Sequence, residues 1–289
     1  GIDYWSLDWA KRVFFDTLRA KGIDAHLIVG NHDIFYRTSL KLNALSLNLR
    51  EYENLSFYTR PETVTIEGTP IFMVPWICED NAELFTERLK KSNASICMGH
   101  LELAGFYANQ DYQCQHGTDP KVFENFDTVF SGHFHKKSKR NNITYLGNSY
   151  QLYWNDVNEI RGFHIFDLET GELEFIENPN KMFHKIYYDE AKQQLFNPNH
   201  YRDSYIKIIV EGKSTPVKLA KFVDDLYKVG VHDVKIIEQI SLDVDDDVEI
   251  EGEDTLTTLT NYVMAMDSSI NKNNLVEIFK SLYVEAQEV

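Results

Sequence analysis

Cysteine is scarce in this 289-residue chain, which has only Cys78, Cys97 and Cys114, and none of the three belongs to a Cys-x-x-Cys pair. Zinc knuckles and dithiol redox sites need that spacing, and a secreted disulfide framework needs an even set of cysteines. We therefore expect three reduced thiols in a cytoplasmic protein that no disulfide stabilises.

Long apolar runs are also missing. No stretch approaches the roughly 20 apolar residues of a membrane-spanning helix, so we expect no membrane partner. The hydrophobic content of 43% is nevertheless enough to bury a core. The length allows one large domain with an appendage, or two or three smaller units.

Basic residues are few relative to acidic ones, because 29 Lys and Arg face 45 Asp and Glu, for a net charge of -16. A protein that coats nucleic acid by bulk electrostatics needs the opposite balance. Any DNA contact must therefore be local. Residues 243–254 concentrate eight acids, which predicts a solvated linker or an exposed acidic loop.

The first half of the chain alternates between helical and strand patterns. Apolar residues at helical spacing predict a helix over residues 2–21, and Gly22 would end it. A short apolar run, AHLIV, predicts a buried strand directly afterwards. Further elements of this α/β sheet are expected as a helix near 38–49, strands at 63–66 and 71–74, a helix near 81–91, and strands at SICM and TVF.

From Ile143 onward the pattern turns to antiparallel strands, and HIFDLETGELEFI predicts a hairpin. A compact β-α-β unit follows, with Thr215 and Pro216 starting its helix. Two amphipathic helices close the chain, and they either bind a partner or pack back onto their own domain. The expected division is 1–180, 181–242, an acidic linker at 243–254, and C-terminal helices at 255–289.

Three places share one construction, in which a buried strand ends in glycine and histidine follows. They are LIVGNHD (Leu27–Asp33), ICMGHLE (Ile96–Glu102) and VFSGHFH (Val129–His135). Loops converge at the carboxyl edge of an open sheet, so these endings can direct side chains into one volume. One such histidine alone is more often structural, but three in the same context favour a shared site.

Imidazole nitrogens together with an asparagine oxygen suit borderline divalent ions such as Mn, Fe or Zn. His133 and His135 lie two residues apart, so they could share one ion or serve two neighbouring ions. Paired ions that hold a phosphate are typical of hydrolases. The pattern therefore indicates metal-assisted phosphoester hydrolysis.

These motifs, GNHD, GH and GHFH, resemble the later motifs of the calcineurin-like metallophosphoesterases. Their order and surroundings are similar to those of the nuclease subunit of the double-strand-break repair complex, particularly in its tailed-phage form. The similar surroundings are VPWICED (Val74–Asp80), YLGNSYQL (Tyr145–Leu152) and IRGFHIFD (Ile160–Asp167). The resemblance covers most of the chain and implies an α/β fold, a β-sandwich flanked by helices.

The resemblance also implies roles for individual residues. Asn31, His100 and His133 would bind one divalent ion and His135 a second, with Mn²⁺ expected and Mg²⁺ as the alternative. His32 would protonate or electrostatically stabilise the leaving oxygen, while Asp33 would orient the His32 ring.

The implied activity is that of a DNA exonuclease and endonuclease in recombination, repair or phage DNA processing, in the host cytoplasm for a phage protein. The β-α-β unit would be a capping domain that orients the duplex. The C-terminal helices would bind the coiled-coil base of an ATPase, and a homodimer is a further expectation. Lys136 and Lys137 begin a basic cluster, KKSKR, that predicts either local phosphate contact or a solvated loop.

The family's opening DxH and GDxxD motifs, which supply the bridging aspartate, are missing, and no Gly-Asp dipeptide occurs in the chain. Asp24 and His26 spell DxH, but they begin the strand that ends at Gly30, about 16 to 20 Å from the expected site. We therefore expect an upstream segment that carries the missing ligands, so that the metallophosphoesterase domain is incomplete here. This chain alone would bind metal weakly and have little nuclease activity.

Two other functions stay open. A phosphatase or cyclic-nucleotide phosphodiesterase would use the same ligands, so only its substrates distinguish it. A non-catalytic interaction subunit would explain both the missing motifs and the terminal helices.

Overall fold

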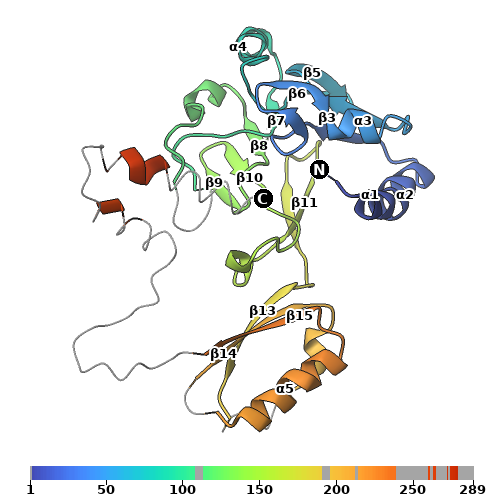
Figure 1. The fold of residues 1–289 in the computed structure, drawn as a ribbon. Coiled ribbons are helices and arrows are strands. Elements are labelled where there is room, and N and C mark those ends of the chain that lie inside the picture. The colour runs from blue at the N-terminus through green and yellow to red at the C-terminus, as the bar shows by residue number, and fades with distance from the viewer. Residues whose placement is uncertain are drawn as a thin grey trace. The chain divides into compact units, whose positions relative to one another are not determined.

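The structure, a computed structural model, forms two compact units (Figure 1). The first comprises Gly1–Ser149 and Ile160–Asn178, and the second comprises Tyr150–Glu159 and Pro179–Val289. The roles predicted for the parts of the chain stay predictions. The described residues are 2–107, 113–190, 196–211, 214–238, 260, 263–264, 272 and 274–278.

A helical segment opens the first unit, as the apolar spacing predicts. It consists of α1 (Tyr4–Ala10), a π-helical turn (Lys11–Phe15) and α2 (Asp16–Ala20). The Asp3 side chain caps its first turn by accepting a hydrogen bond from the Ser6 amide at 2.9 Å. Gly22 follows with a φ of +63°, the left-handed conformation that ends helices.

The predicted strand AHLIV is β1 (Ala25–Ile28), which pairs in parallel with β4 (Leu55–Tyr58) in a two-stranded sheet. A small apolar cluster of Leu49, Tyr52 and Leu55 packs against the helical segment and β1. This packing fixes the position of the strand that leads into the GNHD motif.

A six-stranded sheet forms the centre of the first unit, in the order β5-β6-β7-β8-β10-β9 (Figure 1). Its four inner strands are parallel, and β5 and β9 are antiparallel edges. The four predicted strands of this sheet are confirmed, and the mixed α/β class with them. The prediction of antiparallel strands from Ile143 onward is wrong for Ile143–Tyr145, because this strand pairs in parallel with Thr128–Ser131. The strands are β5 (Glu62–Ile66), β6 (Thr69–Val74), β7 (Ile96–Gly99), β8 (Thr128–Ser131), β9 (Ser138–Arg140) and β10 (Ile143–Tyr145).

The core of this unit lies on the inner strands, because they are buried along most of their length. Phe72, Cys97 and Val129 are fully buried in one cluster. The predicted helix α4 (Ala82–Lys91) adds Phe85 to it, and a 3-10 turn (Pro120–Phe123) adds Phe123. All three cysteines are free, as predicted.

The helix predicted near residues 38–49 is wrong over its first half. The structure has a hairpin of β2 (Ile34–Tyr36) and β3 (Ser39–Asn43), followed by a short helix, α3 (Ala44–Asn48). Asn43 decides the boundary, because its side chain accepts a hydrogen bond from the Ser46 amide at 2.8 Å and so begins the helix.

The predicted hairpin is confirmed as β11 (Gly162–Phe166) and β12 (Leu173–Glu177), which are antiparallel and in continuous register. Its turn contains Gly171 with a φ of +73°. Phe166 packs edge-on against Phe130 of β8 at 4.8 Å between ring centres, so the hairpin joins the apolar cluster beside the central sheet.

The second unit is a three-stranded parallel sheet with one helix across it (Figure 1). The predicted β-α-β elements are β14 (Tyr205–Val210), α5 (Pro216–Lys228) and β15 (Asp233–Glu238). The third strand, β13 (Phe183–Tyr188), pairs with β14. The described part of the unit also contains two 3-10 turns, Trp154–Asp156 and Pro198–Tyr201.

The predicted acidic linker at 243–254 lies outside the described residues. Most of the predicted C-terminal helices, 255–289, lie outside them as well, although the described residues 260, 263–264, 272 and 274–278 are helical. Within the described part of the chain, no helix is both long and apolar enough to cross a membrane.

Candidate metal centre

The carboxyl ends of the inner strands meet at one edge of the central sheet. β6, β7 and β8 are parallel neighbours, and backbone hydrogen bonds continue past their last residues. The His100 amide donates to the Val74 carbonyl at 2.9 Å, and the Gly132 amide donates to the Gly99 carbonyl at 3.0 Å. The segments that carry His100 and His133 therefore lie side by side.

The GNHD segment reaches the same edge from the other sheet. The Trp76 amide, just past β6, donates to the carbonyl of Val29, just past β1, at 2.8 Å. Asn31 follows two residues later. This backbone contact brings the end of the separate β1–β4 pair to the end of the central sheet.

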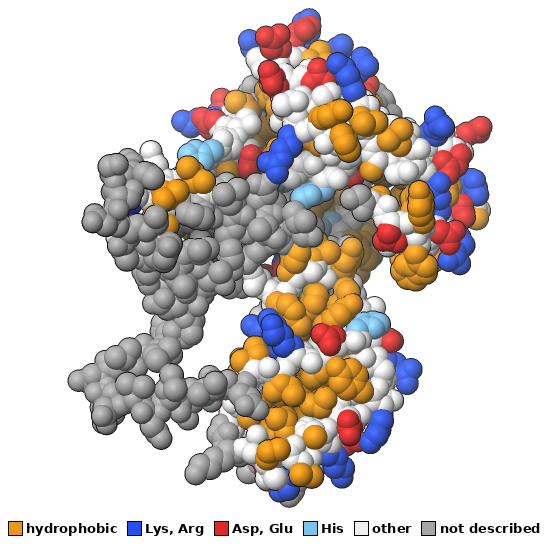
Figure 2. Space-filling model, viewed as in Figure 1, with side chains coloured by type: hydrophobic (Ala, Val, Ile, Leu, Met, Phe, Trp, Pro, Cys, Tyr) orange, Lys and Arg blue, Asp and Glu red, His pale blue; other side chains and the backbone are white. Residues whose placement is uncertain are grey.

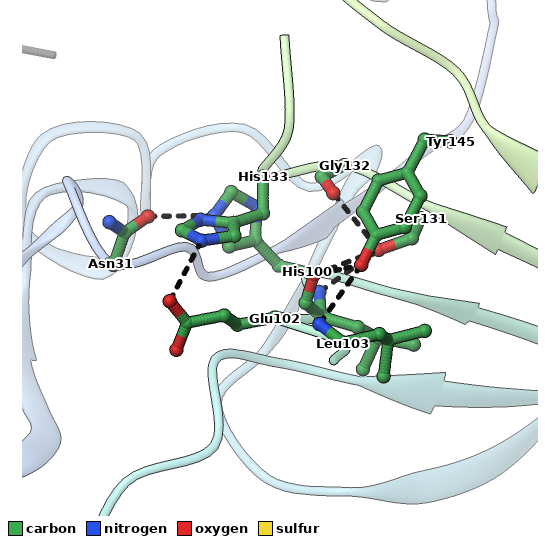
Figure 3. A network of polar contacts seen from close by, with 9 residues as sticks. Asn31, His100, Glu102, Leu103, Ser131, Gly132, His133 and Tyr145 are labelled. Carbon is green, nitrogen blue, oxygen red and sulfur yellow. Dashed lines mark hydrogen bonds and ion pairs between the residues drawn. The ribbon is translucent and has the colours of Figure 1, made fainter. Parts of the chain in front are cut away.

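Side chains from the three strand ends meet there (Figure 3). The Asn31 Oδ1 and His100 Nε2 atoms are 2.7 Å apart, and the rings of His100 and His133 have centres 5.2 Å apart. The Trp76 ring lies 5.1 Å from the His133 ring. The structure thus brings together the side chains of three of the four predicted metal ligands.

Glycine leaves room for the His100 ring at two of these strand ends, most tightly at Gly30. A β carbon on Gly30 would lie 2.8 Å from His100 Cε1, closer than such contacts allow. A β carbon on Gly132 would lie 3.3 Å from His100 Nδ1. The strand, glycine and histidine pattern therefore has a steric cause.

His133 has a strained backbone, with a φ of +79° in the left-handed region. Its side chain is only 7% exposed, and its Nε2 lies 3.8 Å from Glu102 Oε1. Sequence reasoning did not single out Glu102. The spacing could have indicated it: Glu102 lies two residues after His100, just as the predicted ligand His135 lies two residues after His133.

The His100 imidazole is held neutral. Burial lowers its pKa to about 3, and its electrostatic interactions with the neighbouring imidazoles of His133, His32 and His135 lower it further. A neutral ring keeps the lone pair that a metal ion requires. His32 and His135 therefore act electrostatically on this cluster.

The turn between Asn31 and β2 positions the predicted catalytic pair. The Asp33 carboxylate accepts a hydrogen bond from the Gly30 amide at 2.8 Å, which closes the turn. Burial raises the pKa of Asp33, opposed by that hydrogen bond and by the charge of His32. The His32 side chain is exposed, so it is accessible to a substrate.

The backbone of His135 is held by later segments of the first unit. Its carbonyl accepts hydrogen bonds from the Asn148 amide at 3.1 Å and from the Arg161 guanidinium. The exposed Lys137 next to it places its Nζ 3.4 Å from the centre of the Phe175 ring. The YLGNSYQL and IRGFHIFD segments thus support the GHFH loop.

Tyr145 and Ser131 hold the segment after β7 by hydrogen bonds (Figure 3). The Tyr145 hydroxyl donates to the Leu101 carbonyl at 2.8 Å and accepts from the Leu103 amide at 3.2 Å. Ser131 Oγ accepts from the Leu101 amide at 3.0 Å. Because these groups are buried, they fix the backbone on both sides of Glu102.

Comparison with known proteins agrees with this geometry. The family model of the calcineurin-like phosphoesterases matches residues 3–137. Exonuclease subunit 1 of Enterobacteria phage T4 is 33% identical over 292 residues, an alignment that covers 100% of this chain and 84% of the phage protein. The chain belongs to the calcineurin-like phosphoesterase family. This confirms the predicted family and the predicted enzyme class, a metallophosphoesterase.

A second relative of this calcineurin-like phosphoesterase is the D subunit of the nuclease SbcCD from Staphylococcus epidermidis. It is 26% identical over 180 residues, which cover 51% of this chain and 46% of the relative. Both relatives are named as subunits of nucleases.

Calcineurin-like phosphoesterases bind divalent metal ions, and the residues present fit part of such a site. Two imidazoles and one carboxamide oxygen form a donor set suited to a borderline ion. Among the described residues, no group of three His, Cys, Asp or Glu side chains is arranged to hold an ion. The Asn31 oxygen is therefore needed to complete the set that the described residues offer.

Proposed function

We propose that this calcineurin-like phosphoesterase is the DNA-cleaving subunit of a nuclease, and that it hydrolyses phosphodiester bonds with Mn²⁺, or with Mg²⁺ as the alternative. One observation carries the proposal: Asn31, His100 and His133 converge from three strand ends in a chain related over its whole length to a phage exonuclease subunit.

In this proposal Asn31, His100 and His133 hold one ion and His135 holds part of a second site. When bound, the ions supply charge that neutralises the phosphate and activates water. The chain contributes a neutral His100, because burial lowers its pKa to about 3. It also contributes Trp76, whose ring covers the imidazoles and limits the access of bulk water.

His32 is the proposed acid for the leaving oxygen. Its side chain is exposed beside Asn31, where it can reach a bound phosphodiester. Asp33 positions it in two ways, by closing the Gly30 turn at 2.8 Å and through the electrostatic interaction between its carboxylate and His32. Lys136 and Lys137 would contact the phosphates that flank the cleaved bond.

The test compares hydrolysis of labelled DNA by this chain with hydrolysis by a fusion that supplies DxH and GDxxD ahead of Gly1. We expect little activity from the chain alone and Mn²⁺-dependent cleavage by the fusion. The His133→Ala and His135→Ala variants of the fusion should be inactive, while His26→Ala, at an exposed position of β1 outside the cluster, should cleave normally.

Three results would contradict the proposal. Cleavage that persists in His133→Ala and His135→Ala would show that these residues bind no essential ion. A fusion that hydrolyses small phosphoesters and never DNA would instead support a phosphatase or phosphodiesterase, and binding to a partner without any hydrolysis would support an interaction subunit.

We further propose that the chain acts with a coiled-coil ATPase in the host cytoplasm, that residues 255–289 bind this partner, and that residues 181–242 orient the DNA. Deletion of residues 275–289 should abolish co-purification with the ATPase. Retained binding would exclude these helices as the docking site, and a change from dimer to monomer in the deleted chain would assign them to a homodimer.

A further inference from the structure

The three-stranded sheet of the second unit has two unlike faces. One face is covered by α5, where Ile206, Ile208 and Leu226 are fully buried. The other face is made by the alternate residues of each strand, which point away from α5. We call this second surface the outer face, and it consists of Phe183, Lys185, Tyr187, Tyr205, Lys207, Ile209, Asp233, Lys235 and Ile237.

The middle row of the outer face is made entirely of lysine. Lys185 of β13 is directly opposite Lys207 of β14, which is directly opposite Lys235 of β15. Neighbouring strands lie about 4.8 Å apart, so the three α carbons span roughly 10 Å. Three like charges in one register repel one another, and a bound anion would remove that repulsion.

Aromatic rings flank the lysines on one side. Phe183 and Tyr205 stack with centres 5.5 Å apart, and Trp154 packs 4.9 Å from Phe183. The Lys207 Nζ lies 4.2 Å from the centre of the Trp154 ring, so the aromatic row and the lysine row are in contact. Trp154 thereby joins the segment Tyr150–Glu159 to this unit.

The row on the other side is apolar and accessible. Tyr187 is 58% exposed and Ile237 is 38% exposed, with the half-buried Ile209 between them. Asp233 is the acidic residue at the aromatic end of the face. The outer face thus combines one exposed ring, Tyr187, and the half-buried rings of Phe183, Tyr205 and Trp154 with a row of cations.

This arrangement is unusual for a chain with a net charge of -16. Figure 2 shows acidic and basic side chains interspersed over the viewed surface of the first unit, and hydrophobic side chains gathered on that of the second. Burial and the charges of Lys185 and Lys235 lower the pKa of Lys207. The charge of the lysine row is therefore complementary to an anionic ligand.

We propose that the outer face binds single-stranded nucleic acid, with phosphates on Lys185, Lys207 and Lys235 and unpaired bases stacked on Tyr187 and the neighbouring rings. Flat rings beside cations are the features by which proteins bind single strands. Bases in a duplex are already stacked and cannot use them. The choice of DNA as the physiological ligand rests on the proposed nuclease function.

The experiment measures binding of fluorescein-labelled oligo(dT) by fluorescence anisotropy in EDTA, so that no hydrolysis is needed. The full chain should bind it more tightly than a duplex of equal length. The K185Q/K207Q/K235Q variant should bind more weakly. The slope of log affinity against log salt concentration should be smaller by roughly 2, since each phosphate contact to a single strand contributes about 0.7 to it. Tyr187→Ala should bind oligo(dT) about tenfold more weakly, with the same dependence of affinity on salt concentration, because it removes a stacking ring and no charge.

The matched control is K21Q/K90Q/K221Q, which removes three exposed lysines away from the outer face and should leave the affinity nearly unchanged. Circular dichroism confirms that each variant is folded. Three results would each overturn the proposal. The first is an equal loss of oligo(dT) affinity in both triple variants, and the second is an equal affinity of the chain for duplex and for single-stranded DNA. The third is displacement of the DNA by polyglutamate of equal charge. These outcomes are independent of cleavage, so failure of the proposed nuclease activity would be recognised separately.

Discussion

At the scale of single residues, the candidate site depends on where side chains are absent as much as on where they are present. Gly30 and Gly132 leave the space that the His100 ring fills. The ring can therefore face Asn31 and His133 at once. His133 in turn adopts a backbone conformation that non-glycine residues rarely adopt.

Gly30→Ala should displace the His100 ring, because the new β carbon would lie 2.8 Å from Cε1. We expect Mn²⁺ affinity, measured by calorimetry or by paramagnetic broadening of NMR signals, to fall by about 10- to 100-fold, as when groups that orient a metal ligand are changed. Gly68→Ala is the control for backbone strain away from the site: its φ of +81° also disfavours a side chain, but the new methyl group meets no atom within 4 Å and displaces no ring. Unchanged affinity in Gly30→Ala would contradict the assigned packing.

Tyr145→Phe should destabilise the first unit by about 1–3 kcal/mol, because it leaves the Leu101 carbonyl and the Leu103 amide without their buried partner. Urea unfolding measures this change in the free energy of unfolding. Tyr150→Phe, at an exposed tyrosine, should change it by less than about 0.5 kcal/mol. Equal effects of the two substitutions would show that the buried hydroxyl is not structurally important.

At the scale of elements, the start of α5 is fixed by a carboxylate from another segment. Glu190 accepts a hydrogen bond from the Thr215 amide at 2.7 Å and pairs with Lys218 at 2.6 Å. The bond to Lys218 is the largest cause that lowers the pKa of Glu190 to about 2. This contact links the segment after β13 to the helix that covers the sheet.

Because the folded-state pKa of Glu190 lies below its usual value of 4.5, its contribution to stability is present above pH 4.5 and is lost as the pH falls toward 2. The difference in Tm between the wild type and Glu190→Gln should therefore be largest near pH 6 and shrink as the pH is lowered. Glu211→Gln, at an exposed position, should give a small difference at every pH. A difference for Glu190→Gln that is constant with pH would contradict this assignment.

Local patterns predicted most elements but failed where two patterns compete. In the segment 38–49, Leu40 and Leu42 alternate as in a strand, whereas Leu45 and Leu49 are four residues apart, as on one face of a helix. The deciding feature is Asn43, the last residue of β3, whose side chain caps α3. The residues before it pair with β2, and the helix begins directly after it. A single periodic assignment over the whole segment could not find that division.

At the scale of the whole molecule, the sequence predicted that three strand ends share one volume, but not how they are joined. The hydrogen bond from the Trp76 amide to the Val29 carbonyl joins the ends of strands from two different sheets. No local sequence pattern predicts it. The packing of Trp154 on Phe183 and Lys207 is equally non-local. Such contacts depend on tertiary packing, which overrides local propensity.

The central claim is that Asn31, His100 and His133 form one cation site. Mn²⁺ titration of the full chain, followed by NMR of the histidine ring protons, tests it most directly, because paramagnetic broadening detects even weak binding. We expect the signals of His100 and His133 to broaden first, and Asn31→Ala to remove this preference. The account would be contradicted if the signals of His164 and His184 broadened at the same Mn²⁺ concentration as those of His100 and His133.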